Sequence, residues 1–336
     1  MWLSTLGLLV TFGIGILVAP RAAAAPLKKV STIGVLSVAS PPSAPDWQQR
    51  SVLLQELRHL GWREGENVTV EFRWASGWVE RSADLAAERV GLPVDVIVAD
   101  NVALICAVQH ATTTIPIVMF SVNDPVAEGF IASLARPGGN ITGVDASFIA
   151  GLGGKQLEVL TEVVPPGTRA ALLFDPAPSS SDTRTVAGML HEVQVAAQAL
   201  GIPLQVLEVR EPDEFASAFD TARREGAGAL LVLPSIVFGL HQRRLAALAL
   251  EHRLPAIFWR RSFPEAGGLL AYGPQNADLR RRVAYYVDRI LKGATPADLP
   301  VERPTKFELV INLKIAQELG LTIPPTLLFQ ANEIIR

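Results

Sequence analysis

The sequence predicts an α/β fold of two Rossmann-like lobes with parallel sheets, joined by a hinge that the chain crosses three times. The order strand, helix, strand, helix, strand, helix, strand occurs twice, over residues 32–120 and again over residues 170–259. Several strands, such as "VDVIVAD" at 94–100, are nearly continuous apolar runs, which is typical of parallel strands covered on both faces. The connections are too long for hairpins. Two similar lobes imply a cleft between them, and we expect the function to reside there.

The residues of the first repeat justify its elements in order. Thr32 to Val38 is an apolar strand, and the Pro/Ser-rich loop after it cannot continue a strand. Apolar residues recur at helical spacing over 47–60, between a capping Asp46 and a terminating Gly61. Residues 68–74 alternate apolar and polar side chains, which predicts a strand with one exposed face. The remaining elements are a helix at 81–90, a buried strand at 94–100, a helix at 102–110 and a buried strand at 115–120.

The second repeat has the same order of elements. They are a strand at 170–175, a helix to about Leu200, a strand at 204–209, a helix at 213–225, a strand at 229–233, a helix to His252 and a strand at 255–259. Because corresponding strands are spaced alike in the two halves, we interpret the repeat as a duplication.

The residues after Trp259 break the repeat. The Gly-rich segment "EAGGLLAYGP" precedes a long helix at 276–291, and "PTKFELVINLKIAQELGL" then predicts a strand and a helix. Neither piece has a counterpart in the other half, so we expect the tail to exchange between lobes. The predicted crossings lie near Gly143, near Arg260 to Phe263, and near Pro300 to Pro304. The predicted lobes are residues 28–143 with 262–298, and residues 144–261 with 299–336.

Residues 1–25 have the pattern of a secretory signal peptide. An apolar run from Trp2 to Val18 precedes the small residues Ala22 to Ala25. Pro26 disfavours cleavage directly before it, so cleavage one residue earlier is expected. The alternative is an uncleaved membrane anchor, although the run is short for a span of about 20 residues. No cysteine follows the run, which excludes a lipoprotein anchor, and we expect a periplasmic protein.

The composition is that of a globular protein, and we expect no cofactor. Of the 336 residues, 49% are hydrophobic and 19% charged, which supplies ample core material. The formal charge is −3 and there is no long basic run, so we expect no nucleic-acid partner. Cys106 is the only cysteine, so an intrachain disulfide cannot form, and we expect no metal site. We expect a monomer.

Catalytic motifs are missing from the sequence. It contains no G-x-S-x-G, H-E-x-x-H or G-x-x-x-x-G-K-[ST]. The "GLGG" at 151–154 does not directly follow a strong buried strand, so it is not a dinucleotide fingerprint. The five histidines fall on or at the ends of predicted helices, as solvated residues would. We therefore do not expect an enzyme, and predict no catalytic residue.

The loops after the strands are the predicted ligand site. In open α/β sheets, ligands bind outside the carboxyl ends of the strands, where helix N-termini gather. In both halves these loops are rich in Ser, Asn and Asp, which can bind carboxylate and ammonium groups, and an aromatic residue there can stack on a planar ligand. The ligand-binding candidates are Ser40, Asn101, Ser121, Asp124, Asp175, Ser235, Trp259 and Tyr272.

Several candidates also have a structural interpretation. Asp124 and Asp175 each precede a proline, where a turn role is common. The alternative for Trp259 is a position in the core, and the alternative for Tyr272 is a position outside the pocket. For other polar residues of these loops, such as Asp46, the alternative to ligand binding is capping of a helix.

Several segments resemble the ABC transporter substrate-binding protein family, whose characterised members include tryptophan- and aromatic-amino-acid-binding proteins. The resemblance is carried by "LRHLGWREGENVTVEFRWA", "ATTTIPIVMFSVNDPVAEGFIASLARPGGNITGV", "EAGGLLAYGP" and "PTKFELVINLK", and it runs from about Val30 to the C-terminus. It implies a type I periplasmic binding protein, with two Rossmann-like lobes, three hinge crossings and a ligand trapped between the lobes. It does not fix the ligand, and no contact residue is carried over from it.

We therefore predict an extracytoplasmic solute-binding receptor of an ABC importer, which traps an amino acid or related carboxylated compound by hinge closure. Only interactions that form on closure shift the balance between open and closed forms. The expected partners are the small solute, an ABC permease in the inner membrane and its cytoplasmic ATPase. A sensory ligand-binding module and, less favoured, an enzyme on the same fold are the alternatives. Neighbouring permease and ATPase genes would distinguish transport from sensing.

Overall fold

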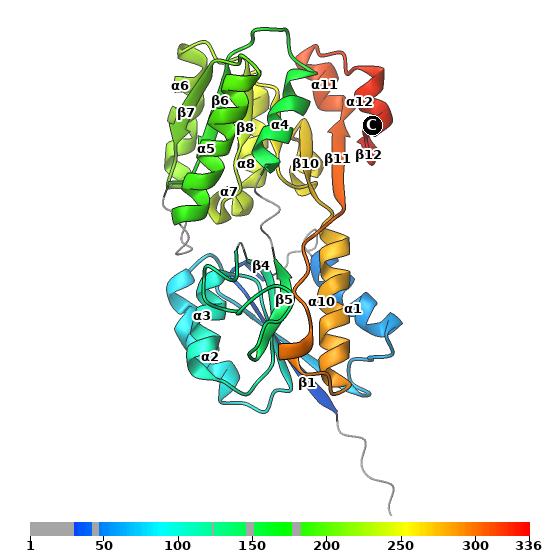
Figure 1. Cartoon of the computed structure of the whole chain (residues 1–336). Helices are drawn as coiled ribbons and strands as arrows, with labels where there is room; N and C mark the ends of the chain where they lie inside the picture. Colours follow the sequence, from blue (N-terminus) through cyan, green and yellow to red (C-terminus); the bar gives the residue numbers. More distant parts are fainter. Residues whose placement is uncertain (1–29, 42–46, 123, 146–150, 177–182) are drawn as a thin grey trace, which may run out of the picture.

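The structure of the chain, a computed structural model, describes residues 30–41, 47–122, 124–145, 151–176 and 183–336. It consists of two α/β lobes, one above the other in Figure 1, and the C-terminus lies on the upper lobe. The predicted signal peptide at residues 1–25 lies outside the described residues. Among the described helices, none combines the length and the apolar character that a membrane span requires.

The first lobe is built on a parallel sheet of five strands in the order β2-β1-β3-β4-β5. The strands are β1 (Ser31–Ser37), β2 (Val68–Trp74), β3 (Val96–Ala99), β4 (Ile117–Val122) and β5 (Ile141–Asp145). One face packs against α1 (Trp47–His59) and α10 (Asn276–Leu291), and the other against α2 (Ser82–Val90) and α3 (Val102–Ala111). Because helices cover both faces, the central strand β3 is buried throughout, as its apolar run predicts.

The second lobe is built on a sheet of seven strands in the order β12-β11-β10-β9-β8-β6-β7. The strands are β6 (Ala170–Phe174), β7 (Leu204–Glu208), β8 (Ala229–Val232), β9 (Ala256–Phe258), β10 (Leu270–Pro274), β11 (Phe307–Asn312) and β12 (Glu333–Ile335). The helices are α4 (Leu152–Thr161), α5 (Thr183–Ala199), α6 (Phe215–Arg224), α7 (Ile236–Leu240), α8 (Gln242–Glu251), α9 (Ser262–Glu265), α11 (Leu313–Leu319) and α12 (Pro325–Gln330). Short 3₁₀ turns lie at Pro212–Glu214 in this lobe and at Val79–Arg81 and Pro296–Asp298 in the first lobe. All strand pairs are parallel except β10 with β11.

Strand β10 belongs to the second sheet, which differs from the lobe division that we predicted. The prediction placed 262–298 in the first lobe and a crossing at Arg260 to Phe263. Instead, β10 pairs in parallel with β9 and antiparallel with β11, and α9 lies beside it. The chain therefore leaves the second lobe after β10, next to Gln275, and only α10 and the turn after it return to the first lobe (Figure 1).

The segments that cross between the lobes are bonded to one another. The end of β5 pairs with the third crossing, where Asp145 N donates to Glu302 O at 2.9 Å. The Asp145 side chain is fully buried and accepts a hydrogen bond from Arg303 Nε at 2.8 Å. The second crossing joins the third, since Gln275 N donates to Lys306 O at 3.0 Å. The three segments therefore form one bonded hinge.

The carboxyl ends of the parallel strands in the two lobes face each other, and we call them the facing edges (Figure 1). Two contacts establish this. Ile236, four residues after β8, packs against a hydrophobic cluster of the first lobe. The turn directly after β2 reaches the second lobe, where a Cβ on Gly77 would lie 2.9 Å from Leu240 Cδ1.

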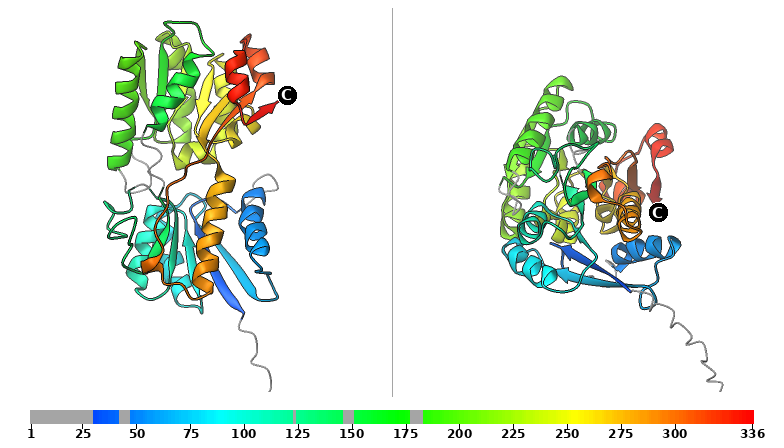
Figure 2. Two further views of the ribbon diagram at one scale, coloured as in Figure 1. Left: turned by 45° about the vertical axis from the view of Figure 1, so that its right-hand side comes forward. Right: turned by 60° about the horizontal axis from the view of Figure 1, so that its bottom comes forward.

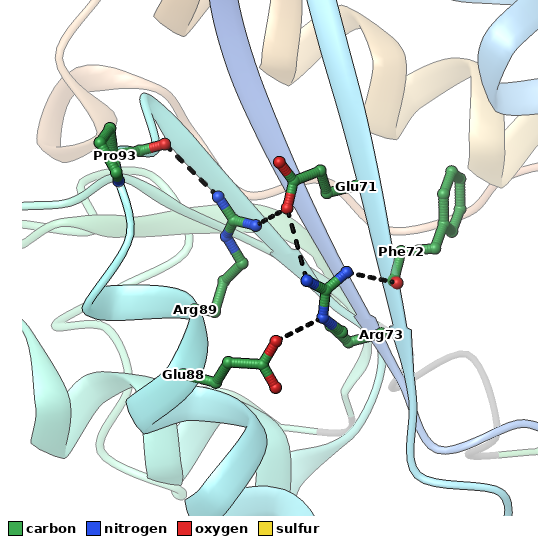
Figure 3. Close-up of polar contacts among 6 residues, drawn as sticks. All are labelled: Glu71, Phe72, Arg73, Glu88, Arg89 and Pro93. Atoms are coloured by element: carbon green, nitrogen blue, oxygen red, sulfur yellow. Dashed lines mark hydrogen bonds and ion pairs between the residues drawn. The ribbon is translucent and has the colours of Figure 1, made fainter.

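A buried arginine fixes helix α2 to the first sheet (Figure 3). Arg89 is 1% exposed, pairs with Glu71 of β2 and donates to Pro93 O at 3.4 Å. Glu71 also lies 3.6 Å from the guanidinium of Arg73. A Cβ on Gly34 of β1 would lie 2.6 Å from Arg89 Cδ, so only glycine leaves room for this side chain. A buried guanidinium requires such partners, and the network lies at mid-strand, away from the facing edge.

Candidate functional site

The first lobe carries a serine–aspartate bridge at its facing edge. Ser37 ends β1, and Asp100 follows the neighbouring strand β3. Ser37 Oγ donates to Asp100 Oδ2 at 2.5 Å, and Val38 N donates to Asp100 Oδ1 at 3.0 Å. Burial raises the pKa of the Asp100 carboxyl, and the hydrogen bond from Ser37 opposes this rise. The bridge thus holds a desolvated carboxyl at the strand end.

A guanidinium stands beside this carboxyl. Arg280 lies in the second turn of α10, and its Cζ is 5.4 Å from the centroid of the Phe120 ring. Burial lowers the pKa of Arg280, while the charge of Asp100 acts in the opposite direction. Arginine keeps its charge in proteins, so this edge presents an acidic and a basic group that interact electrostatically, and the basic group lies over an aromatic ring.

The second lobe carries an equivalent serine–aspartate bridge, but the serine and the aspartate have exchanged strands. Here the aspartate, Asp175, follows β6, and the serine, Ser235, follows β8. Ser235 Oγ donates to Asp175 Oδ2 at 2.8 Å and also accepts from Val237 N at 3.1 Å, so it caps α7. Asp175 is only 3% exposed. Strands β6 and β8 hold the positions in the second sheet that β1 and β3 hold in the first. Both predicted residues, Asp175 and Ser235, therefore meet at one facing edge.

The two aromatic candidates pack within the second lobe. Trp259, just after β9, lies against Phe263 with ring centroids 4.7 Å apart, and the Cζ of Arg260 is 5.1 Å from the Trp259 ring centroid. Tyr272 of β10 stacks on Phe307 at 5.9 Å and packs against the core of this lobe. Both side chains are half-buried. A ligand that reaches them would meet an edge or one face rather than a freely projecting ring.

Two of the four remaining candidates, Asn101 and Asp124, have local roles in the first lobe. The Asn101 side chain accepts from the N–H two residues on, at 2.8 Å, and so caps α3. Asp124 has a φ of 44° and accepts from the N–H three residues on, at 3.1 Å, which is the turn role weighed as its alternative. Ser40 is exposed in the loop after β1. The backbone of Ser121 lies in β4, but its side chain is outside the described part.

Sequence reasoning missed Arg280 and did not single out Asp100. Asp100 lies in a loop that the strand-end rule nominates, but a bridge to Ser37 on another strand has no local pattern. A signal for Arg280 was available. Residues 280–282 are three consecutive arginines in the first two turns of α10, where the helix dipole disfavours cations. Such a local conflict often marks a functional position.

A cavity of about 600 Å³ lies at the opposite, amino-terminal edge of the first sheet. Its lining includes Ser31, Asn67 and Asp95, and its polar groups already bond to the protein itself. Asp95 accepts from Thr32 N at 2.8 Å, and Asn67 Nδ2 donates to Gly61 O at 3.0 Å. This cavity does not adjoin the facing edges. Within the described ranges, no group of three or more His, Cys, Asp or Glu residues could hold a metal ion.

Comparison with known proteins identifies the family to which the chain is similar. Residues 32–335 match the family model described as ABC transporter substrate binding protein. A tyrosine-binding protein of Clostridioides difficile (strain R20291) is 22% identical over 286 residues, which cover 85% of this chain and 79% of that protein.

Solved structures share the fold. A conserved domain protein of Vibrio cholerae superposes with a TM-score of 0.79 at 24% identity, covering 91% of this chain and 100% of that one. An ABC domain of Streptococcus pneumoniae in complex with L-Trp has a TM-score of 0.76 at 24% identity, covering 91% and 99%. These similarities confirm the predicted fold class, the two-lobed type I periplasmic binding protein.

Proposed function

The chain belongs to the ABC transporter substrate-binding protein family, and on that premise we propose that its ligand is a zwitterionic α-amino acid with an aromatic side chain. Family membership makes it a solute-binding receptor that serves an ABC transporter. The amino-acid specificity, the importer role and the contacts with ligand are the content of the proposal. We place the ligand between the facing edges, where Asp100, Arg280, Asp175 and Ser235 lie.

The adjacent opposite charges of Asp100 and Arg280 are the observation that carries this proposal. A carboxylate recognises an ammonium group and a guanidinium recognises a carboxylate, in both cases through charge-assisted hydrogen bonds. An α-amino acid presents these two groups on one carbon, and the two protein groups lie side by side. Both are desolvated by burial, which strengthens their interaction with an enclosed ligand.

Aromatic rings near the same edge support an aromatic ligand. Phe120 lies under Arg280, and the rings of Phe72 and Trp74, at the end of β2, stack 5.6 Å apart. Trp259 lies at the facing edge of the second lobe. Offset and edge-to-face contacts with such rings favour a planar ligand. A relative named as tyrosine-binding and a structural neighbour in complex with L-Trp support the same class.

Closure of the hinge would convert this binding into a signal for the transporter. Converting a mostly open population into a mostly closed one needs about 5.5 kcal/mol of differential binding. A micromolar complex provides about 8 kcal/mol in total, so one amino acid held by both lobes can supply the difference.

The test is titration calorimetry with L-tryptophan, L-tyrosine and tryptamine, which lacks the carboxylate. Arg280→Gln should weaken L-tryptophan binding by roughly 10- to 100-fold, because a charge-assisted hydrogen bond contributes about 1.5–3 kcal/mol. It should leave tryptamine binding nearly unchanged. Arg281→Gln, on the next and more exposed arginine of α10, is the matched control. The proposal fails if the wild type binds neither amino acid, or if the two variants bind L-tryptophan equally.

Three further parts of the proposal concern the protein in its cell. The family is one of binding proteins, and we propose that the ligand is released chemically unchanged, which mass spectrometry of bound and released solute tests. We propose that residues 1–25 direct export to the periplasm, where the protein acts as a monomer beside its permease. N-terminal sequencing of the mature protein and its mass in solution test those two points.

A further inference from the structure

We propose that helix α7 is an interlobe latch, in which Ile236 and Leu240 hold the two lobes closed independently of ligand. The latch concerns closure of the proposed ligand site, so the effect of the latch on ligand affinity rests on the proposed function. The effect of the latch on lobe closure without ligand is independent of that function.

Helix α7 directs one apolar face at the first lobe. Ile236 and Leu240 are the first and last residues of the helix, four positions apart, so they lie on the same side of it. Ile236 packs against the first-lobe cluster that contains Ala75, although it belongs to the second lobe. Leu240, 41% exposed, lies over Gly77 of the first lobe. Both ends of the helix therefore contact the opposite lobe.

The segment under Leu240 is a tight turn. Trp78 N donates to Ala75 O at 3.0 Å, and the central residues Ser76 and Gly77 have φ values of 55° and 84°. Two successive residues with positive φ define a type I′ turn, in which serine is strained. A Cβ on Gly77 would lie 2.9 Å from Leu240 Cδ1, so the end of the Leu240 side chain packs directly against this turn.

The latch is joined to the proposed ligand site through the start of its helix. Ser235 caps α7 and donates to Asp175, which lies at the facing edge. A ligand that contacts Asp175 therefore acts on a residue bonded to the helix that carries Ile236 and Leu240. Loss of the latch should lower the closed fraction, and the apparent affinity falls in proportion to that fraction.

The experiment compares Leu240→Ala with Leu200→Ala, a matched leucine of similar exposure (41% and 45%) on the second lobe, away from the first. Small-angle X-ray scattering of ligand-free protein should show a larger radius of gyration for Leu240→Ala only. Calorimetry with L-tryptophan should show affinity about tenfold weaker for Leu240→Ala, because one apolar contact between the lobes is lost.

The outcomes separate the latch from the identity of the ligand. If the wild type binds no aromatic amino acid, the proposed function fails, and ligand-free scattering alone decides on the latch. Expansion of Leu240→Ala, or its selective loss of affinity, supports the latch. Scattering and affinity that match those of Leu200→Ala overturn it. Circular dichroism identical to the wild type shows that the variants are folded.

Discussion

Replacing Glu308 by glutamine should stabilise the protein at alkaline pH and leave its stability unchanged in acid. Glu308 lies in β11, is 4% exposed, and its Oε1 has no hydrogen-bond partner among the described residues. Its Oε2 is 3.7 Å from Arg261 Nη1. Arg261 is shared with Glu265 at 2.9 Å and Glu333 at 2.6 Å, so it compensates Glu308 only in part.

The direction of the pH dependence follows from the carboxyl pKa. Burial raises the pKa of Glu308, Arg261 opposes the rise, and the neighbouring carboxylates add to it. The folded state therefore binds the proton more tightly than the unfolded state, whose pKa is near 4.3. The contribution of Glu308 to stability is fully retained below that value and is lost as the pH rises through the pKa of the folded state. Glutamine, which carries no charge, removes this loss.

The size of the effect follows from the unsatisfied oxygen. A buried charged group without its hydrogen bond costs about 1–3 kcal/mol, and the lost attraction of Arg261 offsets part of this. We expect Glu308→Gln to gain about 1 kcal/mol at pH 8, which is roughly 2 °C in the melting temperature of a chain of this size. At pH 4 the gain should vanish.

Differential scanning calorimetry at pH 4 and pH 8 measures the difference, with Glu265→Gln as the control. Glu265 contacts the same arginine but is 43% exposed, so its replacement should give a much smaller alkaline gain than Glu308→Gln. A lower melting temperature for Glu308→Gln at pH 8, or an equal gain at both pH values, would refute the reasoning.

Two glycine replacements test close approaches within the first lobe, with urea unfolding as the measurement. Gly34→Ala should cost about 2 kcal/mol, since its Cβ would lie 2.6 Å from the buried Arg89 side chain. Gly143→Ala should cost about 3 kcal/mol or more, because Gly143 has a φ of 135° and its Cβ would lie 2.2 Å from Met119 O. Gly139→Ala, which meets no atom within 4 Å, is the control for both, and a variant that unfolds at the control's urea concentration contradicts its prediction.

Local sequence pattern was sufficient for most elements but not for the path of the tail. The strand predicted at 68–74 is β2, and the helix predicted at 276–291 is α10. Strand β10 was treated as part of a Gly-rich segment because two of its five residues are glycine and proline. Which sheet such a strand joins depends on hydrogen bonds to β9 and β11, and the latter lies more than 30 residues away.

The candidate site shows the same division between local and distant information. The strand-end rule located the loops that hold Asp175 and Ser235, since parallel strands deliver their carboxyl ends to one edge. It could not tell that Asn101 is used in capping its own helix, because a cap and a ligand contact require the same residue type. Nor could it find Arg280, which reaches the first lobe only through the path of the tail.

The path of the C-terminal tail explains why the two facing edges of a duplicated fold differ in charge. Each lobe holds one serine–aspartate bridge between corresponding strands, so the duplication alone supplies a carboxyl on both sides. Two carboxyls would favour a cation. Helix α10, which has no counterpart in the repeat, brings Arg280 next to Asp100 and neutralises one side. A site that presents both charges at one facing edge suits a zwitterion better than a simple cation or anion. If this reasoning is correct, Arg280→Gln should not only weaken L-tryptophan binding but also raise the preference of the protein for tryptamine over L-tryptophan. The view of the two lobes in Figure 2 shows α10 beside the first sheet, as this account requires.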